Sequence, residues 1–212
     1  MQTHPATVVE QLDRGLSAQA NQKRGSWPVR LIGSASEIGD QPQMRLLCAA
    51  TIAFAIIKRD DRLLTTGIKM LSAHTLATWG KSGVKSVVNR TRPESGDDPR
   101  VQLGDSDAHE ENSFPSGHSA GAISVAQAFA RSYPKHSLTA RSAALAVAAV
   151  QVPRGTHYAG DVVAGILIGL GAERASEAAI GSSLQRLDAK TINVALTDVG
   201  RFVQDRVFKR GK

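Results

Sequence analysis

With 212 residues, 42% of them hydrophobic, the chain is long enough for one domain with its own core and too short for two domains of ordinary size. Lysine and arginine outnumber aspartate and glutamate by 26 to 19, which indicates an anionic partner, yet aromatic residues make up only 4%. Because single-stranded nucleic acids are usually bound by stacking on aromatic side chains, no nucleic-acid partner is expected. The one cysteine, Cys48, excludes an intrachain disulfide and a cysteine-based metal site.

Residues 1–28 are predicted to form an amphipathic N-terminal segment. Val8, Val9, Leu12 and Leu16 recur at helical spacing with charged residues between them, which predicts a helix from about residue 5 to residue 24. The apolar side of this helix would lie on a surface, either lipid or protein. No apolar stretch followed by a small-residue cleavage site is found here, so a cleaved secretory signal is not expected.

Residues 29–182 are expected to form the functional unit, an all-α bundle of about five to six core helices. A short apolar piece comes first, at 29–39, and no segment shows a convincing strand pattern. Residues 93–112 are acidic, rich in Gly, Pro and Ser and without periodicity, which indicates a long loop of the kind that is often functional. The expected helices cover residues 43–58, 62–90, 117–132, 138–152 and 157–180.

Residues 183–212 are predicted to form an amphipathic basic C-terminal tail, with a second amphipathic helix from about residue 187. The residues near its apolar side are Val199, Phe202, Val203, Val207 and Phe208, and the chain ends in the basic sequence FKRGK. Such a helix suits an anionic membrane surface, and it is equally compatible with docking on the bundle.

Two observations bear on whether the bundle lies in a membrane. The mean hydropathy is only −0.17, and no long window is purely apolar, as in soluble proteins. However, the helical segments are rich in small residues that pack closely in lipid, and basic clusters at 58–62 and 131–141 fall in alternate connections, as the positive-inside rule requires. We therefore expect a membrane-embedded bundle, with the connections 81–116 and 150–161 together on the opposite side.

The first of three polar clusters in those connections is KSVVNRTRP. Lys85 and Arg92 are seven positions apart, two helical turns, so both cations would project from one side of a helix that Pro93 ends. Two converging cations make a site for a dianion. The same spacing is common on a solvated helix surface.

The second cluster, FPSGH, precedes a helix rich in alanine. A helix start offers unpaired N–H groups and a positive dipole end, Gly117 lets an anion approach the backbone, and Ser116 adds a hydroxyl. These features predict a phosphate site with His118 at its rim. An ordinary N-cap with an incidental histidine explains the same residues.

The third cluster places His157 four positions before Asp161. At helical spacing Asp161 can accept a hydrogen bond from one ring nitrogen of His157, which leaves the other nitrogen basic. With a second histidine nearby, this suits a two-step phosphoryl transfer in which one imidazole attacks phosphorus and the other protonates the leaving oxygen and then activates water. Taken alone, the pair is more typical of a structural contact.

Together the clusters resemble the three signature motifs of the type 2 phosphatidic acid phosphatase superfamily, which includes lipid phosphate phosphatases, class A acid phosphatases and vanadium haloperoxidases. The resemblance runs from about residue 40 to 180 and rests on Lys85, six residues, Arg92-Pro93; Pro115-Ser116-Gly117-His118; and His157, three residues, Asp161. It implies a helical bundle with the motifs at one end and no metal or other cofactor. By this resemblance His157 is the nucleophile, Asp161 its orienting partner and His118 the general acid and base, and the phosphate ligands are Lys85, Arg92, Ser116 and Gly117.

One position departs from the family pattern. The third motif usually begins with Ser-Arg, and the matching residues here are Val150 and Gln151. An amide carries no charge, so a charge-assisted contact to the phosphate is missing. Arg154 lies three positions later, and our hypothesis is that it replaces the missing arginine.

The resemblance implies a phosphatase that acts on a lipid phosphomonoester or diphosphate at an anionic membrane. The expected location is a bacterial inner membrane, with the active site facing away from the cytoplasm. Two alternatives stay open. One is a soluble or peripheral phosphatase for small phosphate esters, and the other is a phosphate-lipid binding protein that has lost catalytic activity because Gln151 stands in place of the arginine. A haloperoxidase is the least favoured, because the chain is small for that branch.

Overall fold

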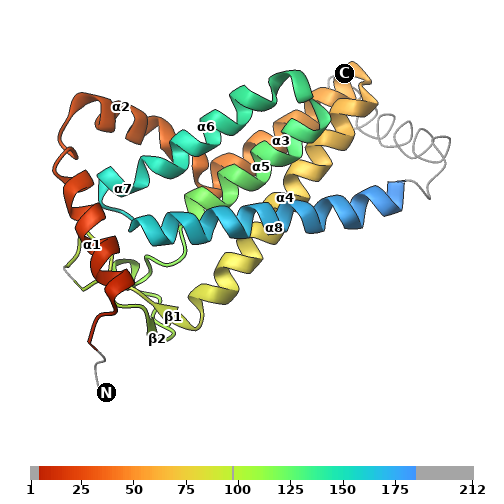
Figure 1. Cartoon of the computed structure of the whole chain (residues 1–212). Coiled ribbons are helices and arrows are strands. Elements are labelled where there is room, and N and C mark those ends of the chain that lie inside the picture. Colours follow the sequence, from red (N-terminus) through yellow and green to blue (C-terminus); the bar gives the residue numbers. More distant parts are fainter. Residues whose placement is uncertain (1–4, 97, 185–212) are drawn as a thin grey trace, which may run out of the picture.

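A computed structural model describes residues 5–96 and 98–184 of the chain. Three long helices form its centre, α4 (Asp61–Lys85), α5 (Gly117–Ser132) and α8 (Ala159–Leu184), and each packs against the other two. Helix α3 (Gln41–Lys58) packs on α4, and α6 (Ser137–Ala149) packs on α5 (Figure 1). The predicted all-α bundle is therefore confirmed.

Short elements gather at one end of the bundle, on the left in Figure 1. Helix α1 (Val8–Asn21) contacts α7 (Gln151–Arg154) and α8, while α2 (Trp27–Ser36) contacts α6 and α7. Helix α1 is shorter than the amphipathic helix predicted from about residue 5 to residue 24, and its apolar side chains are exposed. The same end contains the 3₁₀ turns η1 (Glu37–Gly39) and η2 (His109–Glu111) and the antiparallel strands β1 (Val88–Asn89) and β2 (Gln102–Leu103). The 3₁₀ turn η3 (Pro134–His136) joins α5 to α6 at the other end.

The helix predicted to run to residue 90 ends at Lys85. Beyond it the backbone turns, and β1 pairs with β2 from the long loop, a pairing that the sequence analysis missed. Strands of two residues are too short to show alternation, so no pattern identifies them. The rest of the loop between Pro93 and Asn112 has little regular structure, as predicted.

Two glycines of α8 allow it to approach α5 closely. A Cβ at Gly165 would lie 2.4 Å from the carbonyl oxygen of Ser116, and one at Gly169 would lie 2.6 Å from that of Ala120. Because no side chain fits in these gaps, the start of α8 can lie beside the start of α5. The backbone N–H of Ser116 donates to the carbonyl of Asp161 at 3.0 Å, which joins the second and third clusters directly.

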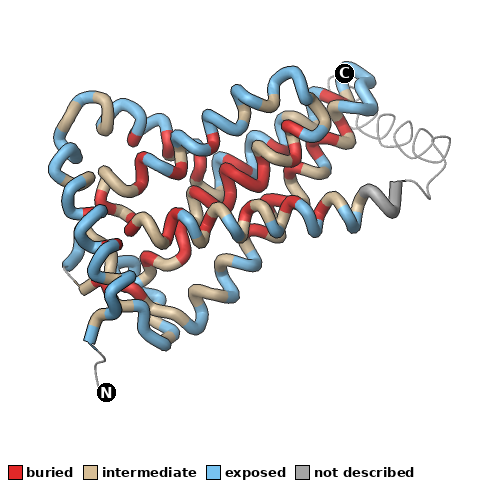
Figure 2. Tube along the Cα trace, viewed as in Figure 1, coloured by how far each residue is buried: buried red, intermediate tan, exposed pale blue. Residues whose placement is uncertain are grey.

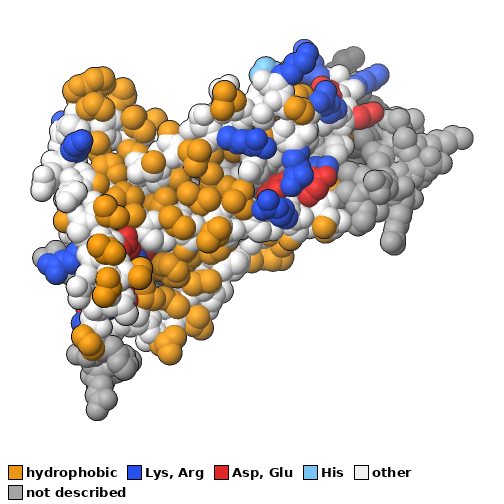
Figure 3. All heavy atoms as spheres, in the orientation of Figure 1, with side chains coloured by type: hydrophobic (Ala, Val, Ile, Leu, Met, Phe, Trp, Pro, Cys, Tyr) orange, Lys and Arg blue, Asp and Glu red, His pale blue; other side chains and the backbone are white. Residues whose placement is uncertain are grey.

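Burial follows the central helices, and Figure 2 shows buried positions concentrated along α5 and the segments around it. One core cluster joins α3, α4 and α5 and contains Cys48 and Met70; another joins α5 and α6 and contains Ile123 and Ala144. Figure 3 shows apolar side chains over the middle of one side of the bundle and charged ones toward the end where α6 begins. None of the described helices combines the length and the hydropathy of a membrane-crossing segment. Most of the predicted tail helix falls outside the described residues.

Candidate active site

A pocket of about 910 Å³ opens at the end of the bundle where α5 and α8 begin. Its walls come from α2, η1, the start of α3, the last two turns of α4, the segment around Arg92, the start of α5 and the segment from α7 to His157. The pocket brings together most of the predicted site residues, although they are up to 72 positions apart in the sequence. The ones that line it are Lys85, Arg92, Gly117, His118, Arg154 and His157.

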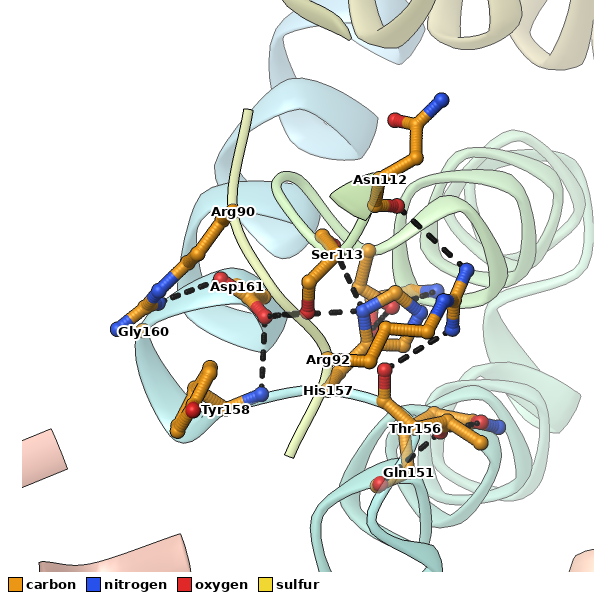
Figure 4. Close-up of polar contacts among 12 residues, drawn as sticks. Arg90, Arg92, Asn112, Ser113, Gln151, Thr156, His157, Tyr158, Gly160 and Asp161 are labelled. Atoms are coloured by element: carbon orange, nitrogen blue, oxygen red, sulfur yellow. Dashed lines mark hydrogen bonds and ion pairs between the residues drawn. The ribbon is translucent and has the colours of Figure 1, made fainter. Parts of the chain in front are cut away.

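The imidazole of His157 is held by a backbone carbonyl (Figure 4). Its Nδ1 lies 2.7 Å from the carbonyl oxygen of Ser113, whereas the nearest oxygen of Asp161 is 3.7 Å away. A carbonyl oxygen only accepts, so Nδ1 carries the proton and Nε2 is the basic nitrogen left for the pocket. The expected hydrogen bond from His157 to Asp161 is therefore wrong, because the loop before α5 places its carbonyl nearer.

Asp161 is a buried carboxylate whose negative charge acts on His157. One of its oxygens accepts from the hydroxyl of Ser113 at 2.5 Å and from the backbone N–H of Tyr158 at 2.9 Å. The other accepts from Arg90 at 2.6 Å. Burial lowers the pKa of His157 to about 4, against the opposing effect of Asp161, so this imidazole is neutral at pH 7.

Arg90 links Asp161 to the N-terminal helix. Its guanidinium is 3% exposed and donates to Asp161, to Asp13 of α1 at 2.8 Å and to the carbonyl of Pro99 at 2.9 Å. The cation also lies over the ring of Tyr158, 4.1 Å from its centre. Asp13 in turn accepts from the backbone N–H of Gly160 at 2.9 Å, near the start of α8. Each of the three buried charged groups therefore has an oppositely charged partner.

Lys85 and Arg92 converge, but not along one helix. Lys85 ends α4 and donates to the side chain of Asn112 at 2.9 Å and to its carbonyl at 2.5 Å, while Arg92 lies beyond the helix end and donates to the carbonyls of His109 and Thr156. The prediction that one helix carries both cations is therefore wrong. The prediction that the two cations converge is right, because the loop brings Arg92 back toward Lys85. Burial, with Arg92 and Lys81 nearby, lowers the pKa of Lys85 to about 7.

The start of α5 only partly matches the predicted phosphate site. Ser116 is fully buried and does not line the pocket; it is the N-cap, accepting from the backbone N–H and the hydroxyl of Ser119. Gly117 and His118 do line it. Nε2 of His118 lies 2.9 Å from a carboxylate oxygen of Asp40, an ion pair when the imidazole is protonated.

Gln151 and Arg154 differ in where they lie. Gln151 is completely buried, donates to the hydroxyl of Ser36 and the carbonyl of Val147, and has no part in the pocket wall. Arg154 lines the pocket, and its guanidinium donates to Glu37 at 2.5 Å and to Ser36 at 2.9 Å. Arg154 thus supplies a cation to the pocket and Gln151 does not.

A possible set of metal ligands lies on the same wall. Single donor atoms of Glu37, Asp40 and His118 lie within 4.8 Å of one another. Glu37 is already paired with Arg154 and Asp40 with His118, so these contacts account for the cluster without an ion.

Sequence reasoning missed Asp13, Ser113 and Arg90. Asp13 stands on a helix taken to be a surface element, and the relevant atom of Ser113 is a backbone carbonyl, which no residue type reveals. Arg90 had a signal, since it lies two positions before Arg92 inside the first motif.

This chain is similar to a known protein family in sequence and to solved structures in fold. The model of the PAP2 superfamily matches residues 66–176. Among solved structures, the chain resembles the first transmembrane PAP2 type phosphatidylglycerolphosphate phosphatase from Bacillus subtilis, with 18% identity, a TM-score of 0.59 and coverage of 84% of this chain and 88% of that one. It also resembles LpxE from Aquifex aeolicus, with 20% identity, a TM-score of 0.57 and coverage of 80% and 98%. No curated protein matches the chain.

Proposed function

The chain belongs to the PAP2 superfamily, and on this basis we propose that it is a phosphatase that hydrolyses a lipid phosphomonoester or diphosphate through a phosphohistidine at His157. One observation carries the proposal: the same pocket contains a neutral, oriented imidazole, a second histidine and cations from three separate parts of the chain. A structural His–Asp pair would not need these partners.

In the first step, Nε2 of His157 attacks phosphorus and the bond from phosphorus to the lipid oxygen breaks. His118 donates a proton to that leaving oxygen. Lys85 and Arg92 bind the phosphoryl oxygens, where negative charge is concentrated in the transition state. In the second step His118 takes a proton from water, the resulting hydroxide attacks phosphorus, and the bond to Nε2 breaks to release inorganic phosphate.

The charge of Asp161 supports the first step. When Nε2 bonds to phosphorus, the imidazole becomes positive while Nδ1 still donates to the carbonyl of Ser113. A buried carboxylate 3.7 Å from Nδ1 stabilises that charge. Arg90 keeps the carboxylate ionised and in place.

We further propose that the pocket lies at the depth of lipid headgroups. The only tryptophans of the chain, Trp27 and Trp79, are 76% and 67% exposed. In the sequence they lie within three positions of the pocket-lining residues Arg30 and Lys81. Tryptophan side chains favour the membrane interface. The basic residues at the turns before α4 and before α6 lie at the opposite end of the bundle, which favours a cytoplasmic position for that end.

The two tryptophans make this placement measurable. In vesicles whose lipids carry bromine on the upper acyl chain, we expect quenching of the tryptophan fluorescence. Quenching should decrease when bromine is moved to the chain ends. Emission unaffected by bromine at either depth would contradict the placement.

The activity is tested by phosphate release in detergent from phosphatidic acid, from an isoprenyl diphosphate and from the soluble ester p-nitrophenyl phosphate. We expect release from a lipid substrate by the wild type and none above background by His157→Ala. His136→Ala, which changes an exposed histidine of η3 at the far end, is the matched control and should keep full activity. Faster turnover of the soluble ester than of every lipid would contradict a lipid substrate, and equal release by His157→Ala would contradict the mechanism.

A further inference from the structure

The pocket contains more positive charge than one phosphate group needs. Its three carboxylates all have specific partners: Glu94 pairs with Arg24 at 2.6 Å, Glu37 with Arg154 at 2.5 Å and Asp40 with His118 at 2.9 Å. Lys85 and Arg92 contact only neutral oxygens. Asp40 also acts on Lys81 through its charge. The wall nevertheless has seven lysines and arginines against these three carboxylates, so some of the cations have no carboxylate paired with them.

Three such cations remain in the wall: Arg30 on α2, Arg45 on α3 and Lys81 on α4. Within the described part of the chain, their side chains make no hydrogen bond or ion pair. Arg30 and Arg45 are exposed, whereas Lys81 is half-buried. Side chains from three different helices thus present unpaired positive charge to one cavity.

Lys81 connects these cations with the proposed phosphate site. A Cβ at Gly117 would lie 2.9 Å from Nζ of Lys81, so the ammonium group lies directly against the start of α5. A side chain at position 117 would have to displace the flexible end of Lys81. Lys81 also stands one helical turn before Lys85, on the same side of α4.

The cations around Lys81 repel one another in the absence of an anion. Burial lowers the pKa of Lys81, Asp40 opposes this effect, and the charges of Arg45 and Arg92 lower the pKa further. An anion bound between Lys81 and Arg45 would relieve that repulsion.

A single phosphomonoester is too small to neutralise all these cations. It carries a charge of about −1.5 to −2 at pH 7, which Lys85 and Arg92 already balance. The cavity of about 910 Å³ has room for a larger anionic headgroup.

We propose that Lys81, Arg45 and Arg30 form a second anion site, which binds a further phosphate group of the same substrate beside the one that is hydrolysed. The substrate class is accordingly a lipid with two phosphate groups, either a diphosphate or a phosphomonoester joined to a phosphodiester. This inference rests on the proposed function for the identity of the substrate, but the anion site itself is open to a separate binding test.

The kinetic test compares three lipids with matched chains: one with a single phosphate, one with a terminal diphosphate and one with a phosphodiester and a phosphomonoester. We expect the wild type to favour one of the two-phosphate lipids in kcat/KM, which also identifies the source of the second phosphate. Lys81→Met and Arg45→Gln should each reduce that preference by about tenfold, the value of one charge-assisted contact. Lys135→Met, which removes an exposed lysine at the far end, should keep the preference. Equal losses for all three lipids would overturn the second site.

The binding test does not depend on turnover. In calorimetry with His157→Ala, we expect methylenebisphosphonate to bind more tightly than inorganic phosphate, and Lys81→Met in that background to remove most of the difference. The same affinity for both anions would overturn the second site whatever the enzyme hydrolyses. Tighter binding of the bisphosphonate by a wild type that releases no phosphate from any lipid would support the anion site and refute the proposed function.

Discussion

His157 donates its Nδ1 proton to the backbone carbonyl of Ser113, 2.7 Å away, and not to Asp161, whose nearest oxygen is 3.7 Å away. The tautomer of the imidazole is therefore fixed by the loop before α5. Asp161 acts on His157 through its charge and through the hydroxyl of Ser113.

This geometry sets the expected effect of Asp161→Asn. The carbonyl of Ser113 still fixes the tautomer, so the loss is that of a charged neighbour, and we expect kcat to fall about 10- to 100-fold. His157→Ala should abolish turnover. Single-turnover kinetics, with thermal unfolding as a check on folding, distinguish the two variants. A fall of about 10⁴-fold for Asp161→Asn, typical of an imidazole in the wrong tautomer, would contradict this geometry.

Arg90 is expected to matter for stability as well as for activity. Arg90→Met leaves the buried carboxylates of Asp13 and Asp161 without their cation, which should lower the free energy of unfolding by about 3–5 kcal/mol. Adding Asp13→Asn should recover part of the loss, because one uncompensated charge is removed. Denaturant unfolding measures both changes. The control Arg24→Met breaks an exposed pair with Glu94 and should cost no more than about 1 kcal/mol; equal losses for the two arginines would refute the buried network.

The sequence predicted the reactive residues of the site better than the residues that hold them in place. The all-α class follows from helical periodicity. The gathering of the motifs at one end follows from the alternation of the connections and from the family resemblance, and the structure brings together Lys85, Arg92, His118 and His157. Ser116 shows a limit, since a hydroxyl at a helix start can point into a pocket or cap the helix, and the sequence does not distinguish these orientations.

Contacts between distant segments were beyond sequence reasoning for a physical reason. Asp13 reaches Arg90 only because α1 folds across α7 and α8, and local periodicity contains no information about such packing. The path of the chain after Lys85 likewise depends on the pairing of β1 with β2, so the spacing of Lys85 and Arg92 suggested a helix that does not exist there.

Arg154 is expected to bind phosphate in place of Gln151. Arg154→Ala should lower kcat/KM by about 10- to 100-fold, since one charge-assisted hydrogen bond is lost. Arg141→Ala, which removes an exposed arginine of α6, is the matched control. Steady-state kinetics on the preferred lipid provide the comparison. Full activity of Arg154→Ala, alongside an inactive His157→Ala, would exclude Arg154 as the substitute.

The pH dependence of kcat/KM should have two limbs, because this quantity follows the titration of the free enzyme. It should fall as the pH drops toward 4, where His157 becomes protonated and Nε2 cannot attack phosphorus. It should also fall as the pH rises, because two groups lose a proton that the reaction needs. His118, whose pKa is lowered by burial, loses the proton that it gives to the leaving oxygen, and Lys85 loses its charge at about pH 7 and binds phosphate less well. Arginine remains charged throughout this range, so Lys85→Arg should move the part of the alkaline limb that Lys85 sets to higher pH and leave the part that His118 sets. An alkaline limb that stays in place in this variant would assign it to another group.

The most direct measurement for the account as a whole is detection of the covalent intermediate. After rapid mixing with a ³²P-labelled lipid phosphate and denaturation at alkaline pH, where phosphohistidine survives, the wild type should carry label on the peptide that contains His157. His157→Ala should carry none, and His136→Ala should be labelled like the wild type. Phosphate release by a wild type that never becomes labelled, or label on a residue other than His157, would contradict the account.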